Sequence, residues 1–289
     1  MSIKSEKALE IFSKIAVRCP LCGESLGTET GGLTCPKGHH FDMARQGSVQ
    51  LLAGKGNGAT YDQPLFAARR QMLSLGLFTP AAEAVLPLLT EATQAGDLWL
   101  DAGCGEGWIT AFEHQRLPGR ITLGLDLAPA GIRMAAAAWG GEILWTVGDL
   151  ARLPLGDGAA RAVLNFLTPA HYGEFYRVLG PEGLLVKVIP GAEHLCELRE
   201  AAGVEPASDS GAREFFEKNC TVLGEKRVTA SLTVLPEHFE AACAMAPFAQ
   251  HRRERALETI RDRKSLTLTA DLIVLWGNVK EKRMGEELA

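Results

Sequence analysis

Three cysteines and a histidine near the N-terminus have the spacing of a metal site. Cys19-x2-Cys22 and Cys35-x3-His39 are separated by 12 residues. Each short pair closes a turn that points two ligands at one ion, and the loop brings the pairs together into a tetrahedral zinc site. His40 is an alternative fourth ligand, and packed, unligated thiols are the alternative to a metal. Four protein ligands leave no open position, so the sequence predicts a structural zinc ion.

A second group of residues has the pattern of a nucleoside site. Residues 101–107 read DAGCGEG, and Trp108 stands where the dinucleotide fingerprint needs its third glycine. No G-x-x-x-x-G-K-[ST] occurs, so a P-loop is excluded. Asp126 follows at a predicted strand end and can accept both ribose hydroxyls. Asp149 and Leu150 follow the next strand, where an acid and a backbone amide can meet an adenine edge. A nucleotide-free α/β domain is the alternative.

The elements that must position these residues alternate between strand and helix. The expected strands are Leu98–Ala102, Ile121–Asp126, Ile143–Val147, Ala162–Leu167 and Leu184–Ile189. The expected helices lie near 107–116, 129–138 and 170–179. This alternation predicts an α/β fold, with a doubly wound, mostly parallel sheet and helices on both faces. Val228–Val234 and Asp271–Trp276 are further expected strands.

Three stretches of different character predict three parts of the chain. Residues 1–55 form a small zinc-binding ribbon, 56–96 a helical connector, and 97–289 the α/β domain. In the connector, Asp62-x-Pro64 and Thr79-Pro80 are helix starts. The ribbon is rich in Gly, Thr and Cys and has almost no apolar periodicity, so we expect it and the α/β domain to have separate cores.

The composition excludes several classes of protein. The chain has 289 residues, 46% of them hydrophobic, and a net charge of −5, so it is not an intrinsically disordered chain. No stretch approaches the roughly 18 uncharged apolar residues of a membrane span. Charges interrupt the first residues, MSIKSEKALEIFSK, and seven cysteines without an export signal favour metal or thiol chemistry in a reducing compartment. We therefore expect a cytoplasmic protein.

The charge is unevenly distributed. Residues 97–209 contain 15 acidic and 8 basic residues, a balance of −7, whereas the remainder contains 20 acidic and 22 basic, a balance of +2. Such a chain is not a bulk polyanion binder, although its flanks can still contact one. Arg69-Arg70 faces either phosphates or solvent, and the charged run 251–264 is either a salt-bridged exposed helix or an RNA patch.

The glycine turn, Asp126 and Asp149 resemble the class I S-adenosylmethionine-dependent methyltransferases. More specifically, the chain resembles the bacterial 23S rRNA (guanine-N1)-methyltransferases over about residues 17–277. The motifs that carry this resemblance are CPLC…CPKGHHFDMARQGSVQLL, AARRQMLSLGLFTP, LDAGCGEGW, VIPGAEHLCEL and MAPFA. The resemblance implies methyl transfer from S-adenosylmethionine to N1 of a guanine in a 23S rRNA hairpin. It also implies RNA recognition by the zinc ribbon and a homodimer with a cleft between its subunits.

The resemblance also assigns residues. Cys19, Cys22, Cys35 and His39 match the zinc ligands, Gly105 and Glu106 match the cofactor loop, and His194 matches a cofactor-contacting histidine. Phe78 stands where the family usually has a tyrosine against the cofactor, and Ser48 stands where its pattern has another tyrosine. Pattern and resemblance together give nine expected cofactor-binding residues: Phe78, Asp101, Gly103, Gly105, Glu106, Asp126, Asp149, Leu150 and His194.

The general base and the acceptor are left open. N1 of guanine carries a proton at neutral pH, and His194 and Asp149 are candidates for its removal only because they follow strands near the cofactor. Residues 165–169, NFLTP, lack the Asn/Asp-Pro-Pro-Tyr/Phe motif of enzymes that methylate amino nitrogens. The alternatives are a methyltransferase acting on a small molecule or another RNA, and a non-catalytic zinc-dependent RNA-binding protein.

Overall fold

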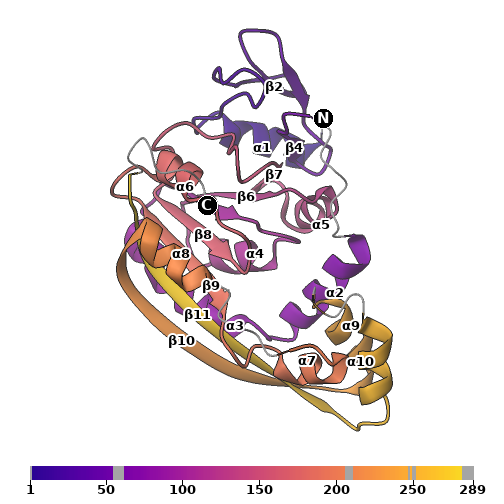
Figure 1. Cartoon of the computed structure of the whole chain (residues 1–289). Coiled ribbons are helices and arrows are strands. Elements are labelled where there is room, and N and C mark those ends of the chain that lie inside the picture. The colour runs from indigo at the N-terminus through magenta and orange to yellow at the C-terminus, as the bar shows by residue number, and fades with distance from the viewer. Residues whose placement is uncertain (1, 55–61, 206–210, 247, 249–251, 282–289) are drawn as a thin grey trace.

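One large sheet and one small sheet organise the chain (Figure 1). The computed structural model describes residues 2–54, 62–205, 211–246, 248 and 252–281. The strands of the small sheet are β1 (Gly27–Glu29), β2 (Gly32–Thr34) and β3 (His40–Asp42). The strands of the large sheet are β4 (Ser48–Gln50), β5 (Leu98–Ala102), β6 (Ile121–Asp126), β7 (Leu144–Val147), β8 (Ala162–Phe166), β9 (Leu184–Pro190), β10 (Cys220–Val234) and β11 (Leu266–Val279).

The large sheet has the order β10-β11-β9-β8-β5-β6-β7-β4. Every neighbouring pair from β9 to β4 is parallel, and β11 and β10 complete the sheet antiparallel. After β4 at the edge, the chain enters the sheet at the central β5, moves outward through β6 and β7, and returns to β8 on the other side of β5. Such a reversal opens a crevice at the carboxyl ends of the strands, where α/β folds bind ligands. The predicted doubly wound, mostly parallel sheet is confirmed.

Helices cover both faces of this sheet. They are α1 (Ile3–Phe12), α2 (Gln63–Ser74), α3 (Thr79–Ala92), α4 (Trp108–His114), α5 (Pro129–Trp139), α6 (Tyr172–Leu179), α7 (Cys196–Ala202), α8 (Ala212–Asn219), α9 (Phe239–Ala244) and α10 (Arg253–Ile260). Along β9, Val186 and Val188 pack with α2, α3, α7, α9 and α10, whereas Leu185 and Ile189 pack with α1, α6 and α8. Successive side chains of a strand point to opposite faces, so β9 contributes to two cores.

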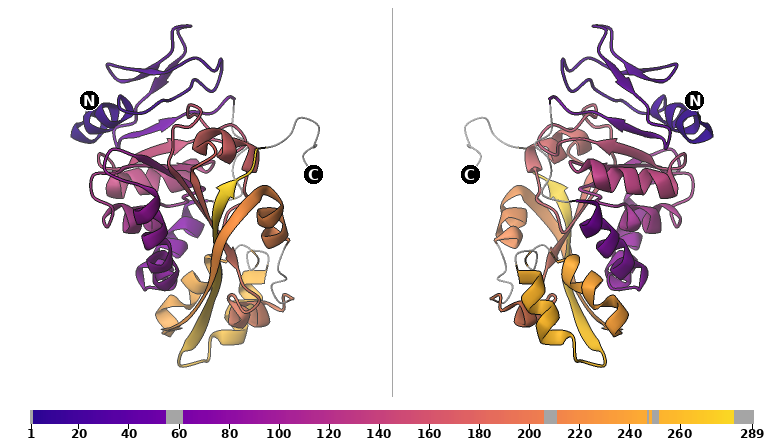
Figure 2. Two further views of the ribbon diagram at one scale, coloured as in Figure 1. Left: turned by 90° about the vertical axis from the view of Figure 1, so that its left-hand side faces the viewer. Right: turned by 90° about the vertical axis from the view of Figure 1, so that its right-hand side faces the viewer.

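The five predicted strands of the parallel sheet agree with β5 to β9 within one residue at each end. The two tail strands were predicted too short, because β10 begins at Cys220 and β11 extends from Leu266 to Val279. They form a long antiparallel pair with a register shift between Val222 and Gly224. Figure 1 shows this pair reaching the end of the molecule opposite the small sheet, and Figure 2 shows α7, α9 and α10 gathered around that end.

The N-terminal segment packs directly on the large sheet. Its last strand, β4, pairs in parallel with β7, and Val17 forms a bridge with Leu155. Val17, Leu33 and Val49 belong to the same buried cluster as Leu155 and the core of the parallel sheet. The prediction of separate cores is therefore wrong. The apolar residues of this segment occur singly, so the sequence shows no periodicity, yet they meet at one edge of the sheet.

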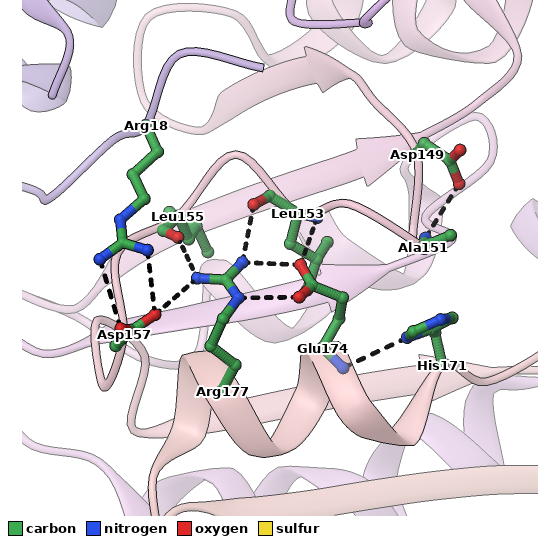
Figure 3. A network of polar contacts seen from close by, with 9 residues as sticks. All are labelled: Arg18, Asp149, Ala151, Leu153, Leu155, Asp157, His171, Glu174 and Arg177. Carbon is green, nitrogen blue, oxygen red and sulfur yellow. Dashed lines mark hydrogen bonds and ion pairs between the residues drawn. The ribbon is translucent and has the colours of Figure 1, made fainter. Parts of the chain in front are cut away.

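A polar network also joins the N-terminal segment to the rest of the chain (Figure 3). Arg18, beside the first metal-site cysteine, lies 3.2 Å from Asp157, which lies 3.0 Å from Arg177. Arg177 also forms an ion pair with Glu174 at 2.6 Å and donates to the carbonyl oxygens of Leu153 and Leu155. The loop between β7 and β8 is thus held between Arg18 of the N-terminal segment and Arg177 of α6.

Two helices connect the N-terminal segment to β5, as predicted. The Asp62 side chain caps α2 by accepting from the backbone N–H of Leu65 at 3.1 Å, and Pro64 lies in the first turn. Gly76, with φ +98°, follows the helix end. In the described residues no single helix is long and apolar enough to cross a membrane; α2 and α3 satisfy that test only together, and they are bent by 82°.

The charged run 251–264 forms α10, with His251 outside the described residues. Ala256 and Ile260 are buried against the core, which fixes which face of the helix is exposed. Arg253 lies 3.7 Å from Glu240 of α9, and Arg261 lies 3.7 Å from Asp262. Within the described residues, these ion pairs do not follow the i,i+4 spacing that the sequence suggested.

Candidate cofactor site and metal centre

The predicted metal ligands converge on one point. The ligand atoms of Cys19, Cys22, Cys35 and His39 lie within 4.8 Å of one another. Sγ of Cys22 is 3.7 Å from Sγ of Cys35, and Nδ1 of His39 is 3.6 Å from Sγ of Cys19 and 3.3 Å from Sγ of Cys35. Zinc bonds of about 2.3 Å to sulfur and about 2.0 Å to nitrogen place tetrahedral ligands roughly 3.5–3.8 Å apart. The donor set therefore fits a zinc ion.

The turns around these ligands explain the spacing. Gly23, with φ +78°, donates its N–H to the Cys19 carbonyl at 2.8 Å, and the N–H of Cys35 donates to the His39 carbonyl at 3.0 Å. His40 lies outside the cluster: its Nδ1 is 2.7 Å from Oγ1 of Thr34, and its Nε2 is 3.3 Å from Asp42. Of the two histidines, the structure thus brings His39 to the sulfur atoms.

The glycine turn lies at the carboxyl end of β5, beside the reversal of the sheet. Gly103 has φ +91°, and a Cβ there would meet the Thr168 side chain at 2.2 Å, so a larger residue does not fit. The N–H of Gly105 donates to Oδ2 of Asp126 at 2.9 Å, and the N–H of Ala128 donates to Oδ1 at 2.8 Å. Asp126 therefore fastens the turn to the end of β6.

Buried carboxyl groups surround this turn. Burial, followed by the charges of Asp126 and Glu106, raises the pKa of Asp101 to about 7. Oδ2 of Asp101 accepts from Oγ1 of Thr110 at 2.6 Å, while Oδ1 is buried without a hydrogen-bond partner among the described residues. Burial also raises the pKa of Glu106 and of Asp126. An unpaired buried oxygen within an excess of carboxyl groups fits a cationic cofactor, such as the sulfonium compound that the resemblance implies.

Arg69 and Arg70 both face this loop. Nε of Arg69 is 3.9 Å from Oε2 of Glu106, and Arg70 donates to the backbone carbonyl of Glu106 at 2.5 Å. The Arg70 guanidinium also stacks 4.8 Å from the centre of the Trp139 ring. The sequence left phosphates and a solvated helix face as alternatives; the observed contacts are with the glycine turn, and contact with phosphates stays a prediction. Their contacts make them supports of the glycine turn.

Asp149 and Leu150 follow β7, next to the end of β6. The N–H of Gly148 donates to the Asp126 carbonyl at 3.0 Å, which brings the two strand ends together. Asp149 is exposed, and its Oδ1 accepts from the N–H of Ala151 at 2.9 Å (Figure 3). Leu150 is half-buried. Their roles toward the adenine stay predictions.

A pocket of about 800 Å³ opens beside the glycine turn, and Phe78, Thr168 and His194 line it. The Phe78 and His194 rings lie 5.6 Å apart between centroids. Nδ1 of His194 is buried without a hydrogen-bond partner among the described residues. Burial, followed by the charge of Arg199, lowers the pKa of His194 to about 4, so its imidazole is neutral at pH 7. Asp149, the other candidate base, is not among the lining residues.

The loop that carries His194 is held by an ion pair that the sequence analysis missed. Arg227 of β10 donates from Nε and Nη2 to the two carboxylate oxygens of Asp271 in β11, at 2.7 and 2.8 Å. Asp271 in turn accepts from the N–H of Glu193 at 3.0 Å, and a Cβ at Gly191 would meet its carboxylate at 2.3 Å. The one sign of this role in the sequence is that Asp271 is an acidic residue inside an otherwise apolar strand.

The motif MAPFA lies at the same pocket. Met245, Ala246 and Phe248 line the pocket, and Pro247 and Ala249 lie outside the described residues.

Comparison with known proteins agrees with both sites. Residues 17–55 match the zinc-ribbon family model described as "RlmA, N-terminal", and residues 100–183 match a model described as "Methyltransferase domain". A Bacillus subtilis protein named "Putative 23S rRNA (guanine-N(1)-)-methyltransferase YxjB" is 31% identical, over 90% of this chain and 96% of its own length. The "23S rRNA (guanine(748)-N(1))-methyltransferase" of Streptomyces fradiae is also 31% identical, over 82% of this chain and 86% of its own. The chain therefore belongs to the family of 23S rRNA (guanine-N1)-methyltransferases, with a zinc ribbon and a class I methyltransferase fold.

Proposed function

We propose that this protein transfers a methyl group from S-adenosylmethionine to N1 of a guanine in a 23S rRNA hairpin. One observation carries the proposal: a single chain combines the zinc ribbon with a pocket of about 800 Å³, and Thr168 of the pocket lining donates to the Gly103 carbonyl of the glycine turn. A volume of that order accommodates a small organic group such as a base. Base-modifying enzymes bind their target unstacked in such pockets. The family relatives, which match over most of their length, support the same acceptor.

The cofactor supplies a methyl group on a sulfonium, which is already a good leaving group, so the protein acts mainly by positioning. In this proposal the backbone of Gly103 and Gly105 lies against the cofactor, Asp126 accepts from its ribose, and Asp149 and Leu150 bind its adenine. Asp101 and Glu106 provide negative charge, and Phe78 and His194 border the transferred group. Cys19, Cys22, Cys35 and His39 hold the zinc ion that stabilises the ribbon.

The assembly and location of the protein are part of the same proposal. In this proposal residues 1–55 recognise RNA, residues 56–96 connect the two domains, and residues 97–289 bind the cofactor. The contact between the ribbon and the large sheet holds the RNA-binding part in a fixed position relative to the cofactor site. The protein acts in the cytoplasm, where ribosomal RNA is modified, and two chains form a homodimer that holds the hairpin between them. Light scattering coupled to size exclusion tests the dimer, since it separates masses of one and two chains.

Mass spectrometry of 23S rRNA from a strain lacking this gene tests the acceptor. We expect one N1-methylguanine to be missing from the deletion strain and to be restored by the wild-type gene. The purified, zinc-loaded protein should methylate the rRNA of the deletion strain and not that of the parent. An unchanged modification profile, or a methyl group on another atom of the base, would contradict the proposal.

Arg70 provides a further prediction about the cofactor loop. Arg70→Ala should weaken S-adenosylmethionine binding by about tenfold, because a hydrogen bond from a charged group contributes about 1.5–3 kcal/mol and this one holds the Glu106 carbonyl. Calorimetry measures the effect, with Arg133→Ala, an exposed arginine on α5, as the matched control. The salt dependence of RNA binding should not change, since Arg70 contacts the loop. A weaker salt dependence of RNA binding together with unchanged cofactor affinity would show that Arg70 contacts RNA phosphates instead of supporting the loop.

A further inference from the structure

Lys187 occupies an unusual place in the pocket. It lies in the middle of β9, is 4% exposed, and lines the cavity beside Thr168. Its Nζ donates to Oδ1 of Asn165 at 2.5 Å and to the backbone carbonyl of Thr168 at 2.7 Å. Lysine is among the residues least often fully buried unless it is paired. The sequence analysis passed over it because it occurs singly in the apolar run LLVKVIP.

Both acceptors of Lys187 are neutral. Among the described residues, no carboxylate oxygen lies within ion-pair distance of its Nζ, whereas burying an isolated charge is costly. A neutral amine has two N–H groups and one lone pair, and two acceptors use both N–H groups. The remaining tetrahedral position of Nζ then carries the lone pair. An ammonium group would need a third acceptor for its third N–H.

The charges around the pocket favour the neutral amine. The lining cations are Arg69, Arg199, Lys218 and Lys280, and the lining carboxylate among the described residues is Glu281. His171, Tyr172 and His194 complete the titratable groups that line it. Burial lowers the pKa of Lys187 to about 8, so about a tenth of the amine is neutral at pH 7 and more of it as the pH rises.

The other titratable groups of the pocket are less suited to take a proton from N1 of guanine. Nδ1 of His171 accepts from the N–H of Glu174 at 3.2 Å, where it caps α6. The imidazole of His194, whose pKa is near 4, is a weak base. Burial raises the pKa of Tyr172, so its phenol keeps its proton. Lys187 combines access to the pocket with a basic nitrogen that is partly unprotonated near pH 7.

We infer that Lys187 is the general base that removes the N1 proton of the guanine, an assignment that rests on the proposed function. The N1–H bond breaks and an Nζ–H bond forms, which leaves an electron pair on N1. That pair forms the new bond to the methyl carbon, and the sulfur keeps the electrons of the bond that breaks. The products are N1-methylguanine, the thioether and the Lys187 ammonium ion, so charge and protons balance. Asn165 and Thr168 orient the amine.

Single-turnover methylation of rRNA from the deletion strain, at saturating cofactor and across pH 6 to 9, tests the assignment. The wild-type rate should rise about tenfold per pH unit below pH 8 and level off above it, where the amine is mostly neutral. Lys187→Met should lower the rate at least about a hundredfold, the usual contribution of a general base, and keep its cofactor affinity. Lys226→Met is the matched control, because Lys226 is an exposed lysine of β10 that does not line the pocket.

Two further measurements separate a base from a structural lysine. Propylamine should restore part of the activity of Lys187→Ala and leave the activity of Lys226→Ala unchanged. In protein labelled with carbon-13 at the lysine ε position, the signal missing from Lys187→Met should titrate near pH 8 without any substrate. A wild-type protein that methylates no rRNA would refute the proposed function. A wild-type protein that methylates guanine, with an unchanged rate in Lys187→Met or a Lys187 signal still charged at pH 9, would overturn only the assignment of the base.

Discussion

Cys22→Ser is expected to release the zinc ion and unfold the small sheet. Its Sγ is one of four converging ligand atoms, 3.7 Å from Sγ of Cys35. Structural zinc contributes about 10–16 kcal/mol to folding in zinc-finger peptides, which is as large as the total stability of many domains. A three-strand sheet with three-residue strands has no core that replaces it. Elemental analysis should find one zinc per wild-type chain and almost none in the variant.

Loss of the ribbon should extend into the large domain. The N–H of Gly156 donates to the Ala16 carbonyl at 2.9 Å, and the N–H of Arg18 donates to the Pro154 carbonyl at 3.1 Å. Hydrogen exchange should therefore show lost protection at Gly156 as well as within the ribbon. Cys196→Ser, the same change in a half-buried cysteine outside the cluster, should leave zinc content and protection unaltered. Full protection of Gly156 in Cys22→Ser would show that the two parts fold independently.

The sequence predicted best what depends on local spacing. The metal ligands were predicted from the separations of Cys19, Cys22, Cys35 and His39, because a short turn fixes the distance between two neighbouring ligands. The strand Leu98–Ala102 was also predicted to the residue, since a strand buried on both faces is a nearly continuous apolar run, here interrupted by Asp101 and followed by glycines.

What the sequence could not predict depends on which surfaces meet. Arg69 and Arg70 lie on a predicted helix, yet periodicity does not reveal that α2 turns them toward Glu106. The first half of β10, from Cys220 to Arg227, is an edge strand with a register shift, and it is exposed except at Cys220 and Gly224, so it lacks the apolar pattern of a buried strand. Burial of Lys187 follows from the neighbouring strand supplying Asn165, a contact between distant residues.

For Asp126, the sequence predicted its position at the end of a strand but not its hydrogen bonds to the backbone of Gly105 and Ala128. Asp126→Ala should weaken S-adenosylmethionine binding by at least about tenfold, since each hydrogen bond to a charged group contributes about 1.5–3 kcal/mol. The variant loses the acceptors of Gly105 and Ala128 as well as those expected for the ribose. Each carboxylate oxygen has about two acceptor sites, so one on each remains for a hydroxyl. Asp262→Ala, an exposed aspartate, is the control.

A double-mutant cycle separates contact with the ribose from support of the loop. Methylthioadenosine and its 2′,3′-dideoxy analogue differ only in the two ribose hydroxyls, and calorimetry gives the affinity of each for wild type and Asp126→Ala. If Asp126 binds the ribose, removing the hydroxyls should weaken binding to wild type about tenfold and leave the variant almost unaffected, because the partner is already gone. If removing the hydroxyls weakens binding equally in wild type and in Asp126→Ala, Asp126 acts only by fastening Gly105, and another residue accepts from the ribose. Unchanged affinity of Asp126→Ala for S-adenosylmethionine would exclude both roles, because the carboxylate would then neither bind the cofactor nor hold the turn in its binding conformation.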